Sequence, residues 1–338
     1  MNIFKALSLA SSMLVALAVP AVASVTISSP TNKTEVTSPF TLTATAITCS
    51  SQTVSAIGYS LDNSRDTAIV RETYVKAEVV SPTGIHTLHV KAWGTEGALC
   101  VSDVTVTVNA GTTNISPPSD AVSVSNIETL SNWKAQHDPA TPGSSTGYMS
   151  LVGTPAMSGS AREFTTKYSG SGGELYHISF GEDTTAKNFL YDTWIYIAGS
   201  SASLANLEMD MNQVIENGQV VIYGFQCDGW SGTWDYAENI GTPQHSHAHW
   251  LHSKAGCNPR NWSTNTWHHV QVQYSRTDSG VVTYRYVALD GVETELNVTV
   301  PAAFALGWAP TLVANFQVDG IGAGQTTIYM DKMTITRW

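Results

Sequence analysis

The sequence predicts an all-β protein with two successive β domains. Short runs that alternate apolar and polar residues recur along the chain, and turn residues such as Ser29-Pro30-Thr31-Asn32 and Asp290-Gly291 separate these runs. A helical pattern occurs only as a short stretch near residues Asn126 to Lys134. A length of 338 residues, less an N-terminal export signal, is typical of two domains.

The N-terminus has the pattern of a signal peptide over residues 1–23. Lys5 supplies the positive region, Ala6 to Val19 the apolar stretch, and Ala21-Val22-Ala23 the small-residue cleavage site. The apolar stretch is too short to span a membrane, and no later segment reaches that length. We therefore expect a secreted or periplasmic protein without a membrane span.

Residues 24–110 form the first predicted domain. About seven short strands in some ninety residues are typical of a two-sheet sandwich. The clearest predicted strands are Val25 to Ile27, Phe40 to Ala44, Ala56 to Leu61, His86 to Trp93 and Val101 to Val108.

The amino-acid sequence of this domain resembles bacterial immunoglobulin-like modules of exported enzymes and adhesins. The resemblance rests on "VTISSPTNKTEVTSPFTLTATA", "AIGYSLDN" and "GIHTLHVKAW". It implies an Ig-like β-sandwich, most often a spacer and sometimes a weak binder. Residues 111–120 are polar, contain Pro117-Pro118 and lack periodicity, so we expect a linker there.

Residues 121–338 form the second predicted domain, again almost all β. Long alternating strands over this length fit one two-sheet jelly roll. The predicted strands are Glu174 to Phe180, Leu190 to Ile197, Leu207 to Met211, Gln219 to Cys227, Trp267 to Tyr274, Val281 to Leu289, Leu312 to Val318 and Thr327 to Ile335.

The segments "NTWHHVQVQYSR", "GVVTYRYVALDGVE" and "TTIYMDKMTITRW" resemble the concanavalin-like lectin and glucanase superfamily, including laminin-G-like modules. The resemblance implies a concanavalin-like β-jelly roll. It also places Asp331 in the last strand where many such domains hold a structural Ca²⁺. No cofactor is otherwise required by the pattern.

Charge and cysteine content narrow the partners. The formal net charge of -11 argues against nucleic acid and polyanionic substrates and is compatible with a neutral polysaccharide. Four cysteines in an exported chain suggest two disulfides. Pairing within each domain is the most economical of the three connectivities and gives Cys49–Cys100 and Cys227–Cys257. We expect a monomer.

The strand Asn206 to Gln213 carries the main functional signal. Its alternation directs Leu207, Met209 and Met211 to a core and Glu208, Asp210 and Asn212 to the opposite face. Two carboxylates on one face stand out in a chain that is only 13% charged. They fit either an exposed strand edge or the floor of a glycan-binding cleft.

Glu208-Met209-Asp210 resembles the Glu-x-Asp core of retaining laminarinases, lichenases and fungal-type cellobiohydrolases. The resemblance implies that Glu208 is a nucleophile and that Asp210 tunes its protonation. That family has its acid/base Glu four or five residues after the first, where this chain has Asn212 and Gln213. An amide cannot exchange a proton in this way. The missing carboxylate would have to come from another strand, with Asp228, Asp235 and Glu238 as candidates.

An aromatic cluster follows directly. If residues 227–236 are extended, Trp230, Trp234 and Tyr236 share one face and could stack on pyranose rings. The alternative is that these rings belong to the core under a loop.

A histidine-rich stretch completes the candidate site. Period two places His245, His247 and His249 on one face, beside Trp250, where they could chelate Zn or Cu, line a polar cleft, or lie on a loop surface. A Cys227–Cys257 bridge would hold the intervening residues as a long binding loop. The predicted substrate-binding residues are Asn212, Gln213, Trp230, Trp234, Tyr236, His247, His249, Trp250 and Gln271, the last from a strand expected to line the concave sheet.

Several functions fit these patterns. The favoured one is recognition of a neutral polysaccharide in the concave face of the second domain. The alternative is an endo-β-glucanase-like glycoside hydrolase that uses Glu208 with a carboxylate from residues 228–238. A polysaccharide lyase, in which Gln213 would help neutralise a uronate, and a protein-binding adhesin fit less well. The residues leave open whether the chain is an enzyme.

Overall fold

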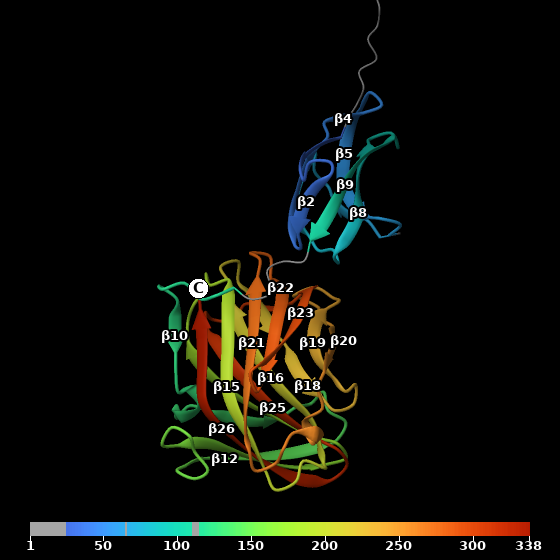
Figure 1. The fold of residues 1–338 in the computed structure, drawn as a ribbon. Coiled ribbons are helices and arrows are strands. Elements are labelled where there is room, and N and C mark those ends of the chain that lie inside the picture. The colour runs from blue at the N-terminus through green and yellow to red at the C-terminus, as the bar shows by residue number, and fades with distance from the viewer. Residues whose placement is uncertain (1–24, 65, 110–114) are drawn as a thin grey trace, which may run out of the picture. The chain divides into compact units, whose positions relative to one another are not determined.

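The computed structural model describes residues 25–64, 66–109 and 115–338. These residues form β-strands and turns almost throughout, with two short 3₁₀ turns, η1 (Ile127–Thr129) and η2 (Pro259–Asn261) (Figure 1). The all-β prediction is therefore confirmed. The immunoglobulin-like and concanavalin-like assignments stay predictions. The predicted signal peptide, residues 1–23, and residues 111–114 of the predicted linker lie outside the described residues.

The first nine strands form two sheets of their own. One sheet has the order β1-β3-β7, and the other has the order β2-β9-β8-β5-β4 with β6 on β5. The Cys49–Cys100 disulfide, predicted from the sequence, joins β4 to β9. The bounds are β1 Thr26–Ser29, β2 Thr34–Thr37, β3 Phe40–Thr45, β4 Thr48–Cys49, β5 Gln52–Leu61, β6 Ala68–Val70, β7 Tyr74–Val79, β8 Gly84–Gly94 and β9 Leu99–Asn109.

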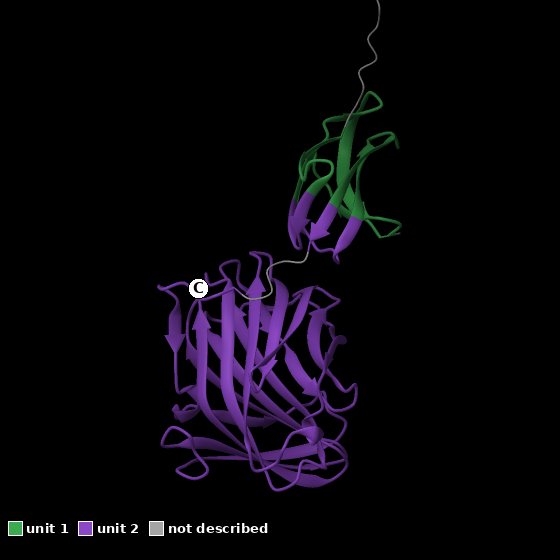
Figure 2. Cartoon of the chain, viewed as in Figure 1, with its two compact units in different colours: residues 1–34, 42–77, 86–106 green, residues 35–41, 78–85, 107–338 purple. Residues whose placement is uncertain are grey.

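The chain divides into two compact units (Figure 2). Unit 1 runs up to Thr34 and includes Leu42–Ala77 and His86–Val106, and unit 2 holds the remainder. The candidate site residues lie in the part of unit 2 that follows residue 114. The predicted domain limits at 110 and 121 stay a prediction.

The second half of the chain contributes an eight-stranded sheet with the order β12-β13-β26-β15-β21-β22-β23 and β10 paired to β26. Asp290 and Gly291 both have positive φ, as a type I′ hairpin requires, and they join β22 to β23 as predicted. The bounds are β10 Val122–Val124, β12 Ser144–Val152, β13 Ala161–Ser169, β15 Asn188–Ala198, β21 Trp267–Arg276, β22 Val281–Leu289, β23 Val292–Pro301 and β26 Gly324–Arg337.

A nine-stranded sheet packs against it, with the order β11-β14-β25-β16-β18-β19-β20, with β17 paired to β16 and with β24 paired to β17. The Cys227–Cys257 disulfide, also predicted, ties the end of β18 to the residue after β20. The bounds are β11 Lys134–His137, β14 Gly173–Gly181, β16 Leu204–Val214, β17 Gln219–Tyr223, β18 Phe225–Asp228, β19 Thr233–Asn239, β20 Ala248–Gly256, β24 Ala303–Leu306 and β25 Leu312–Gly320.

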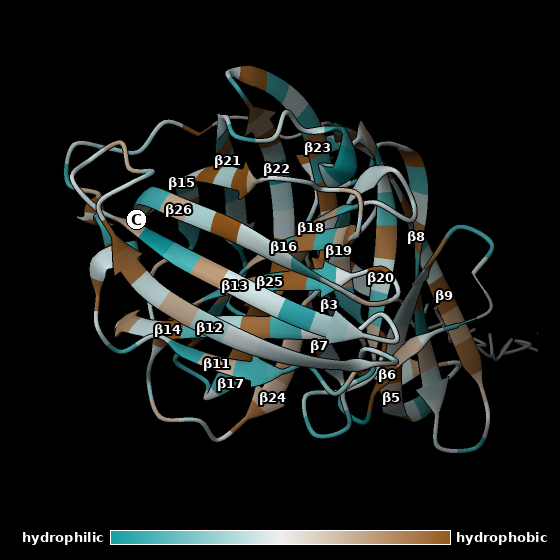
Figure 3. Cartoon of the chain, turned by 90° about the horizontal axis from the view of Figure 1, so that it is seen from below, coloured by the Kyte–Doolittle hydropathy of each residue, from teal (hydrophilic) through white to brown (hydrophobic). Residues whose placement is uncertain are grey.

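The apolar faces of these two sheets enclose one core. On β16, Leu207, Met209 and Met211 are completely buried in it, as their alternation predicts. Phe316 and Val318 of β25 and Tyr274 of β21 join the same core. Figure 3 shows the alternation as successive brown and teal bands along the strands. The polar face of the nine-stranded sheet is thereby left to form a site.

Two predictions of local structure were wrong. The segment between Cys227 and Cys257 is not a long loop, because most of it forms β19 and β20, which extend the nine-stranded sheet. The helical pattern near residues 126–134 gives one 3₁₀ turn, η1, which places buried Ile127 and Trp133 in the core. Tertiary burial, rather than helical propensity, decides that segment.

Candidate functional site

A cavity of about 640 Å³ lies over the polar face of the nine-stranded sheet. Its floor comes from β16, β18, β19, β20 and β25, and its rim comes from the segment after β11. The lining residues are Asp138, Ala140, Thr141, Pro142, Ser171, Ala205, Asn206, Glu208, Gln226, Asp228, Trp230, Asp235, Ala248, Trp250, His252, Gln317, Asp319 and Gly320.

The strand register aligns the polar side chains in rows. Glu208 is paired with Gln317 of β25 on one side and with Gln226 of β18 on the other. Gln226 is paired in turn with Asp235 of β19, and Asp235 with His252 of β20. Residues directly opposite each other in an antiparallel sheet lie on the same face. These five side chains therefore form one central row across the sheet.

A second row runs beside the first, two residues along each strand. Asn206 of β16 is paired with Asp319 of β25 and with Asp228 of β18, and Asp228 is paired with Thr233 of β19. All of these except Thr233 line the cavity. The two rows place carboxylates and amides in alternation over the floor.

Amide hydrogens connect the acids in the centre. The Gln317 side-chain amide donates to Glu208 Oε1 at 3.1 Å, to Asp319 Oδ1 at 3.0 Å and to Asp138 Oδ2 at 3.0 Å. Asp210, next on the same face of β16, accepts from the Phe225 backbone N–H at 2.8 Å. The acids of the floor are therefore held by amide and backbone N–H donors.

Burial and mutual repulsion shift these carboxyls strongly. Burial, and then the charges of Asp210 and Asp319, raise the pKa of Glu208 well above its usual value. Burial raises the pKa of Asp210 to about 7, and it raises the pKa of Asp319 to about 7 as well. Neighbouring carboxylates in such a site oppose one another's ionisation.

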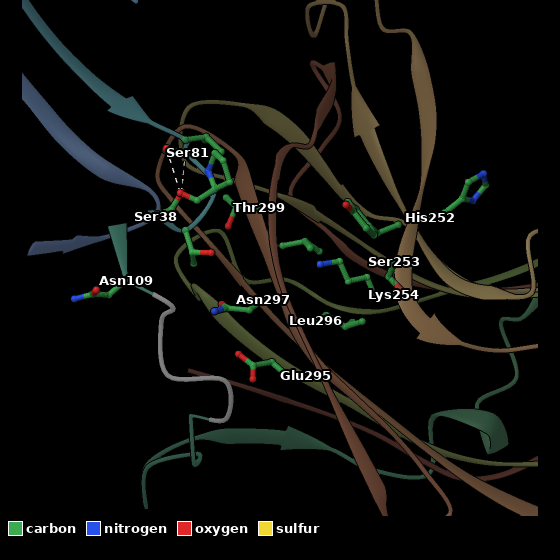
Figure 4. A pocket seen from close by; sticks show the side chains of 15 residues that line it. Ser38, Ser81, Asn109, His252, Ser253, Lys254, Glu295, Leu296, Asn297 and Thr299 are labelled. Atoms are coloured by element: carbon green, nitrogen blue, oxygen red, sulfur yellow. Dashed lines mark hydrogen bonds between the residues drawn. The ribbon is translucent and has the colours of Figure 1, made fainter. Parts of the chain in front are cut away.

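Asp235 and His252, at the outer end of the central row, form a compact group with Asp228 of the second row. His252 Nδ1 lies 2.8 Å from Asp235 Oδ2, and one ligand-type atom of each of the three residues lies within 4.8 Å of the others. Asp235 is completely buried, whereas the His252 side chain is 63% exposed. Figure 4 shows the His252 ring projecting from β20 away from Ser253 and Lys254.

Hydroxyl and backbone donors hold this group in place. Thr233 Oγ1 donates to Asp235 Oδ1 at 2.5 Å, and Ser231 Oγ lies 3.1 Å from Asp235 Oδ2. The Trp230 backbone N–H donates to Asp228 Oδ1 at 2.6 Å. Burial, partly offset by the hydrogen bonds with Thr233 and His252, raises the pKa of Asp235.

Two predicted tryptophans line the cavity. Trp230, in the turn between β18 and β19, is 63% exposed, and Trp250 on β20 is half-buried. They lie in the lining together with Glu208 and Asp235, two of the predicted catalytic residues. Whether these residues bind or act on a substrate stays a prediction.

The predicted aromatic face was wrong for Trp234 and Tyr236. Trp234 is buried in the core, where it stacks on Phe225 at 5.2 Å, and Tyr236 packs on Tyr284 at 5.4 Å between ring centroids. The cause is the turn at residues 229–232, which ends the extended chain before β19 begins. Trp230 therefore shares no strand face with the other two rings.

Gln213 was also wrong as a cleft residue. It is completely buried on the core side of β16, where its Oε1 accepts from Tyr223 Oη at 2.8 Å and from Arg276 Nε at 2.7 Å. Gln213 is two residues after Met211, and alternate residues of a strand share a face, so the sequence already assigns Gln213 to the core face. Gln213 is therefore not part of the cavity lining.

Glu238 and His249 lie outside the cavity as well. Each is one residue out of phase with the cavity face, and they pair with each other, His249 Nδ1 to Glu238 Oε1, at 2.9 Å. His247 lies before β20 and is exposed, and it does not line the cavity. None of His245, His247 and His249 lines the cavity, and only His249 belongs to β20, which begins at Ala248.

Three further predictions concern residues away from the cavity. Gln271 was wrong as a cleft residue, because β21 belongs to the eight-stranded sheet and the Gln271 side chain donates to Asp192 Oδ2 at 2.6 Å. Asn212 does lie on the polar face of β16, where its Oδ1 accepts from Asn315 at 3.1 Å, but beyond the cavity lining. Asp331 is completely buried and accepts hydrogen bonds from the Ser158 backbone N–H at 3.1 Å and from the Ser158 hydroxyl. Its calcium role stays a prediction.

Sequence reasoning missed Gln226, Gln317, Asp319 and Asp138 as cavity residues, whereas His252 belongs to the histidine-rich stretch. The strand Leu312–Gly320 carries Asn315, Gln317 and Asp319 at every second position, opposite a buried apolar set. This is the same period that identified Glu208 and Asp210, so the signal was present. Asp138 gave no such signal, because it lies in a turn.

Comparison with known proteins assigns no family to the chain. No family model matches the chain, and no curated protein matches it. Among solved structures, it is similar to a carbohydrate-binding module from the β-sandwich superfamily, at 13% identity over 91% of this chain and 96% of that one, with a TM-score of 0.33. It is also similar to the cellulose-induced protein Cip1, at 15% identity over 60% and 90% of the two chains, with a TM-score of 0.36.

A third similar structure is the carbohydrate-binding module CBM66 from Bacillus subtilis, at 12% identity over 56% of this chain and 94% of that one, with a TM-score of 0.28. These scores are too low to carry an argument about the ligand or the activity of this chain. The function has to be argued from the site.

Proposed function

We propose that this chain is a secreted carbohydrate-recognition protein that binds a neutral polysaccharide in the cavity over the nine-stranded sheet. The observation that carries the proposal is one cavity with a floor of aligned carboxylates and amides and with Trp230 and Trp250 in its lining. Two disulfides are consistent with an oxidising, extracellular compartment.

The two kinds of lining side chain match the two kinds of surface on a sugar. Pyranose rings present apolar C–H patches, for which a rigid indole face such as that of Trp230 or Trp250 offers contact area at little entropic cost. Their hydroxyls need acceptors, which Asp228, Asp319 and the amide of Gln226 provide. A cavity with a few polar groups and aromatic walls is a common ligand-site design.

The charge of the cavity favours an uncharged glycan. Its lining contains five carboxyl groups and neither Lys nor Arg among the described residues. A polyanion such as a uronate polymer would be repelled, and no cationic side chain in the lining would compensate. Neutral β-glucans, xylans and mannans are therefore the substrates to test.

The test compares three tryptophan variants in a binding assay on these polysaccharides. Trp250→Ala and Trp230→Ala each remove a cavity indole, and we expect affinity to fall about tenfold or more. Trp308→Ala is the matched control, because Trp308 is 47% exposed and lies outside the cavity lining. The proposal is wrong if no neutral glycan binds, or if all three variants bind as tightly as the wild type.

A second candidate function is an inverting glycoside hydrolase. Glu208 and Asp235 lie in one row with Gln226 between them. Two strand intervals separate the backbones of Glu208 and Asp235 by about 9–10 Å. This separation is nearer to the carboxyl spacing of about 6.5–9.5 Å in inverting enzymes than to the spacing of about 5–5.5 Å in retaining enzymes. The raised pKa of Glu208 suits a general acid.

Reducing-end release separates the two candidates. The recognition proposal expects none on any glycan of the panel. Release that disappears in Glu208→Gln and in Asp235→Asn, with glycan binding retained, would establish the hydrolase instead. The anomer of the first product, followed by NMR, would then report inversion.

A further inference from the structure

A buried amide oxygen in the cavity floor lacks a partner. Gln226 is 4% exposed, and its Oε1 atom has no hydrogen-bond partner among the described residues. A buried acceptor without a partner costs about 1–3 kcal/mol. Such a group is rare in folded chains and calls for a specific explanation.

This oxygen lies among acids. Gln226 has Glu208 and Asp235 as its cross-strand partners and Asp228 two residues away on the same face. Each of these neighbours is a carboxyl group, and an ionised carboxylate accepts hydrogen bonds without donating any. An added acceptor such as the Gln226 oxygen can therefore be satisfied only by a donor or a cation.

Three side chains on β18, β19 and β20 have the spacing of a ligand set. Asp228, Asp235 and His252 each present one ligand-type atom within 4.8 Å of the others. An ion at about 2.0–2.4 Å from each ligand fits among atoms so placed. The Ser231 and Thr233 hydroxyls already orient the Asp235 carboxylate, as outer-shell groups do around metal ions.

We propose that Asp228, Asp235 and His252, completed by the Gln226 side-chain oxygen, form a binding site for one divalent cation. The mixed set of carboxylate, amide and imidazole donors favours Zn²⁺ or Mn²⁺ over Ca²⁺, which prefers oxygen ligands alone. The ion would also compensate the charge of an acidic lining that, in the described part of the chain, includes neither Lys nor Arg. Exposure of the His252 ring gives the ion a route from solvent.

The site does not depend on the proposed glycan function. Its ligands are set by β18, β19 and β20, and a cation can bind them without any sugar present. Metal binding and glycan binding are therefore measured separately, and the failure of one leaves the other standing.

The experiment is calorimetric titration of the full chain, carrying no histidine tag, with ZnCl₂, MnCl₂ and CaCl₂ in separate runs after chelation and dialysis. The wild type is compared with His252→Ala and with His249→Ala. The second variant is a matched control, because His249 also pairs with a β19 carboxylate, that of Glu238, but on the other face of the strand. Thermal unfolding without metal checks that all three proteins are folded.

We expect one Zn²⁺ or Mn²⁺ per chain, with binding at least about tenfold weaker in His252→Ala and unchanged in His249→Ala. Gln226→Leu, which removes the unpartnered oxygen, should also weaken metal binding without lowering the metal-free melting temperature. The proposal is overturned if no cation binds more tightly than about 1 mM. It is equally overturned if His252→Ala binds like His249→Ala, or if only Ca²⁺ binds.

Discussion

Replacing Asp210 by asparagine should stabilise the protein at alkaline pH. Asp210 is 8% exposed and lies beside Glu208 on the polar face of β16. Its ionisation in the folded chain is opposed by burial, and the negative charges of Asp319 and Asp138 add to this effect. Asparagine has nearly the same shape and retains the oxygen that accepts from the Phe225 backbone N–H.

The magnitude follows from the two states of the carboxyl. Its pKa is near 3.8 when unperturbed and about 7 in the folded chain. Between these pH values the unfolded chain has released the proton and the folded chain retains it, so the free energy of unfolding falls as the pH rises. At about 1.36 kcal/mol per pH unit, the loss for Asp210 reaches about 4 kcal/mol by pH 7 and stays constant above it.

The assay is urea unfolding of the wild type and of Asp210→Asn from pH 4 to 8.5, followed by tryptophan fluorescence in the presence of a chelator. We expect equal stability near pH 4 and a more stable variant above pH 7, by up to about 4 kcal/mol. Asp278→Asn is the control, since the Asp278 side chain is 80% exposed and its pKa is lowered by Lys187. A wild type whose stability is flat or rises between pH 5 and 8 would refute the reasoning, as would a less stable Asp210→Asn at pH 8.

Two further predictions concern stability around the cavity. Trp234→Ala should lower the free energy of unfolding by about 3–5 kcal/mol, because this ring is buried in the core. Trp230→Ala should change it by at most about 0.5 kcal/mol, because this ring is exposed. Equal effects of the two variants in urea unfolding would contradict the assignment of the two rings. Replacing both Cys227 and Cys257 by serine should cost about 3–4 kcal/mol, because the bridge closes a segment with a separation of 30 residues; unchanged urea midpoints would show that the strands alone hold β19 and β20.

The sequence predicted correctly the alternation of β16 from Leu207 to Asn212. Leu207, Met209 and Met211 are buried in the core, and Glu208 and Asp210 lie on the opposite face. Alternation within one strand follows from backbone geometry alone, so no partner strand is needed to assign it. The error on Gln213 came from departing from that same alternation.

Whether residues on the two sides of a turn share a sheet face could not be predicted in this way. Trp230 and Trp234 are four residues apart, yet the turn at residues 229–232 separates them, with Gly232 at a φ of 75°. One is exposed at the cavity and the other is buried against Phe225. A turn changes which residues of the two flanking strands share a face, and the sequence of the turn does not specify this change.

Sheet membership also depends on distant residues. The stretch with Gln271 and Gln273 and the stretch with Gln317 and Asp319 read alike, as polar residues alternating with apolar ones. The first belongs to β21 of the eight-stranded sheet and the second to β25 of the nine-stranded sheet. Only the pairing of β25 with β16 distinguishes them, and this pairing joins residues about a hundred positions apart.

The surroundings of Glu208 link its role to that of the proposed cation. Its two cross-strand neighbours, Gln226 and Gln317, are amides, so within its row the partner carboxylate is Asp235, one strand further out. Asp235 is also the group that the cation would engage together with His252. A carboxylate bound to a metal ion is no longer free to accept a proton from water. If the protein is an inverting hydrolase, Zn²⁺ bound to Asp235 should therefore inhibit glycan hydrolysis. If it is a recognition protein, it should bind glycan with the metal in place. Glycan assays run with and without Zn²⁺ thus decide whether Asp235 serves chemistry or coordination.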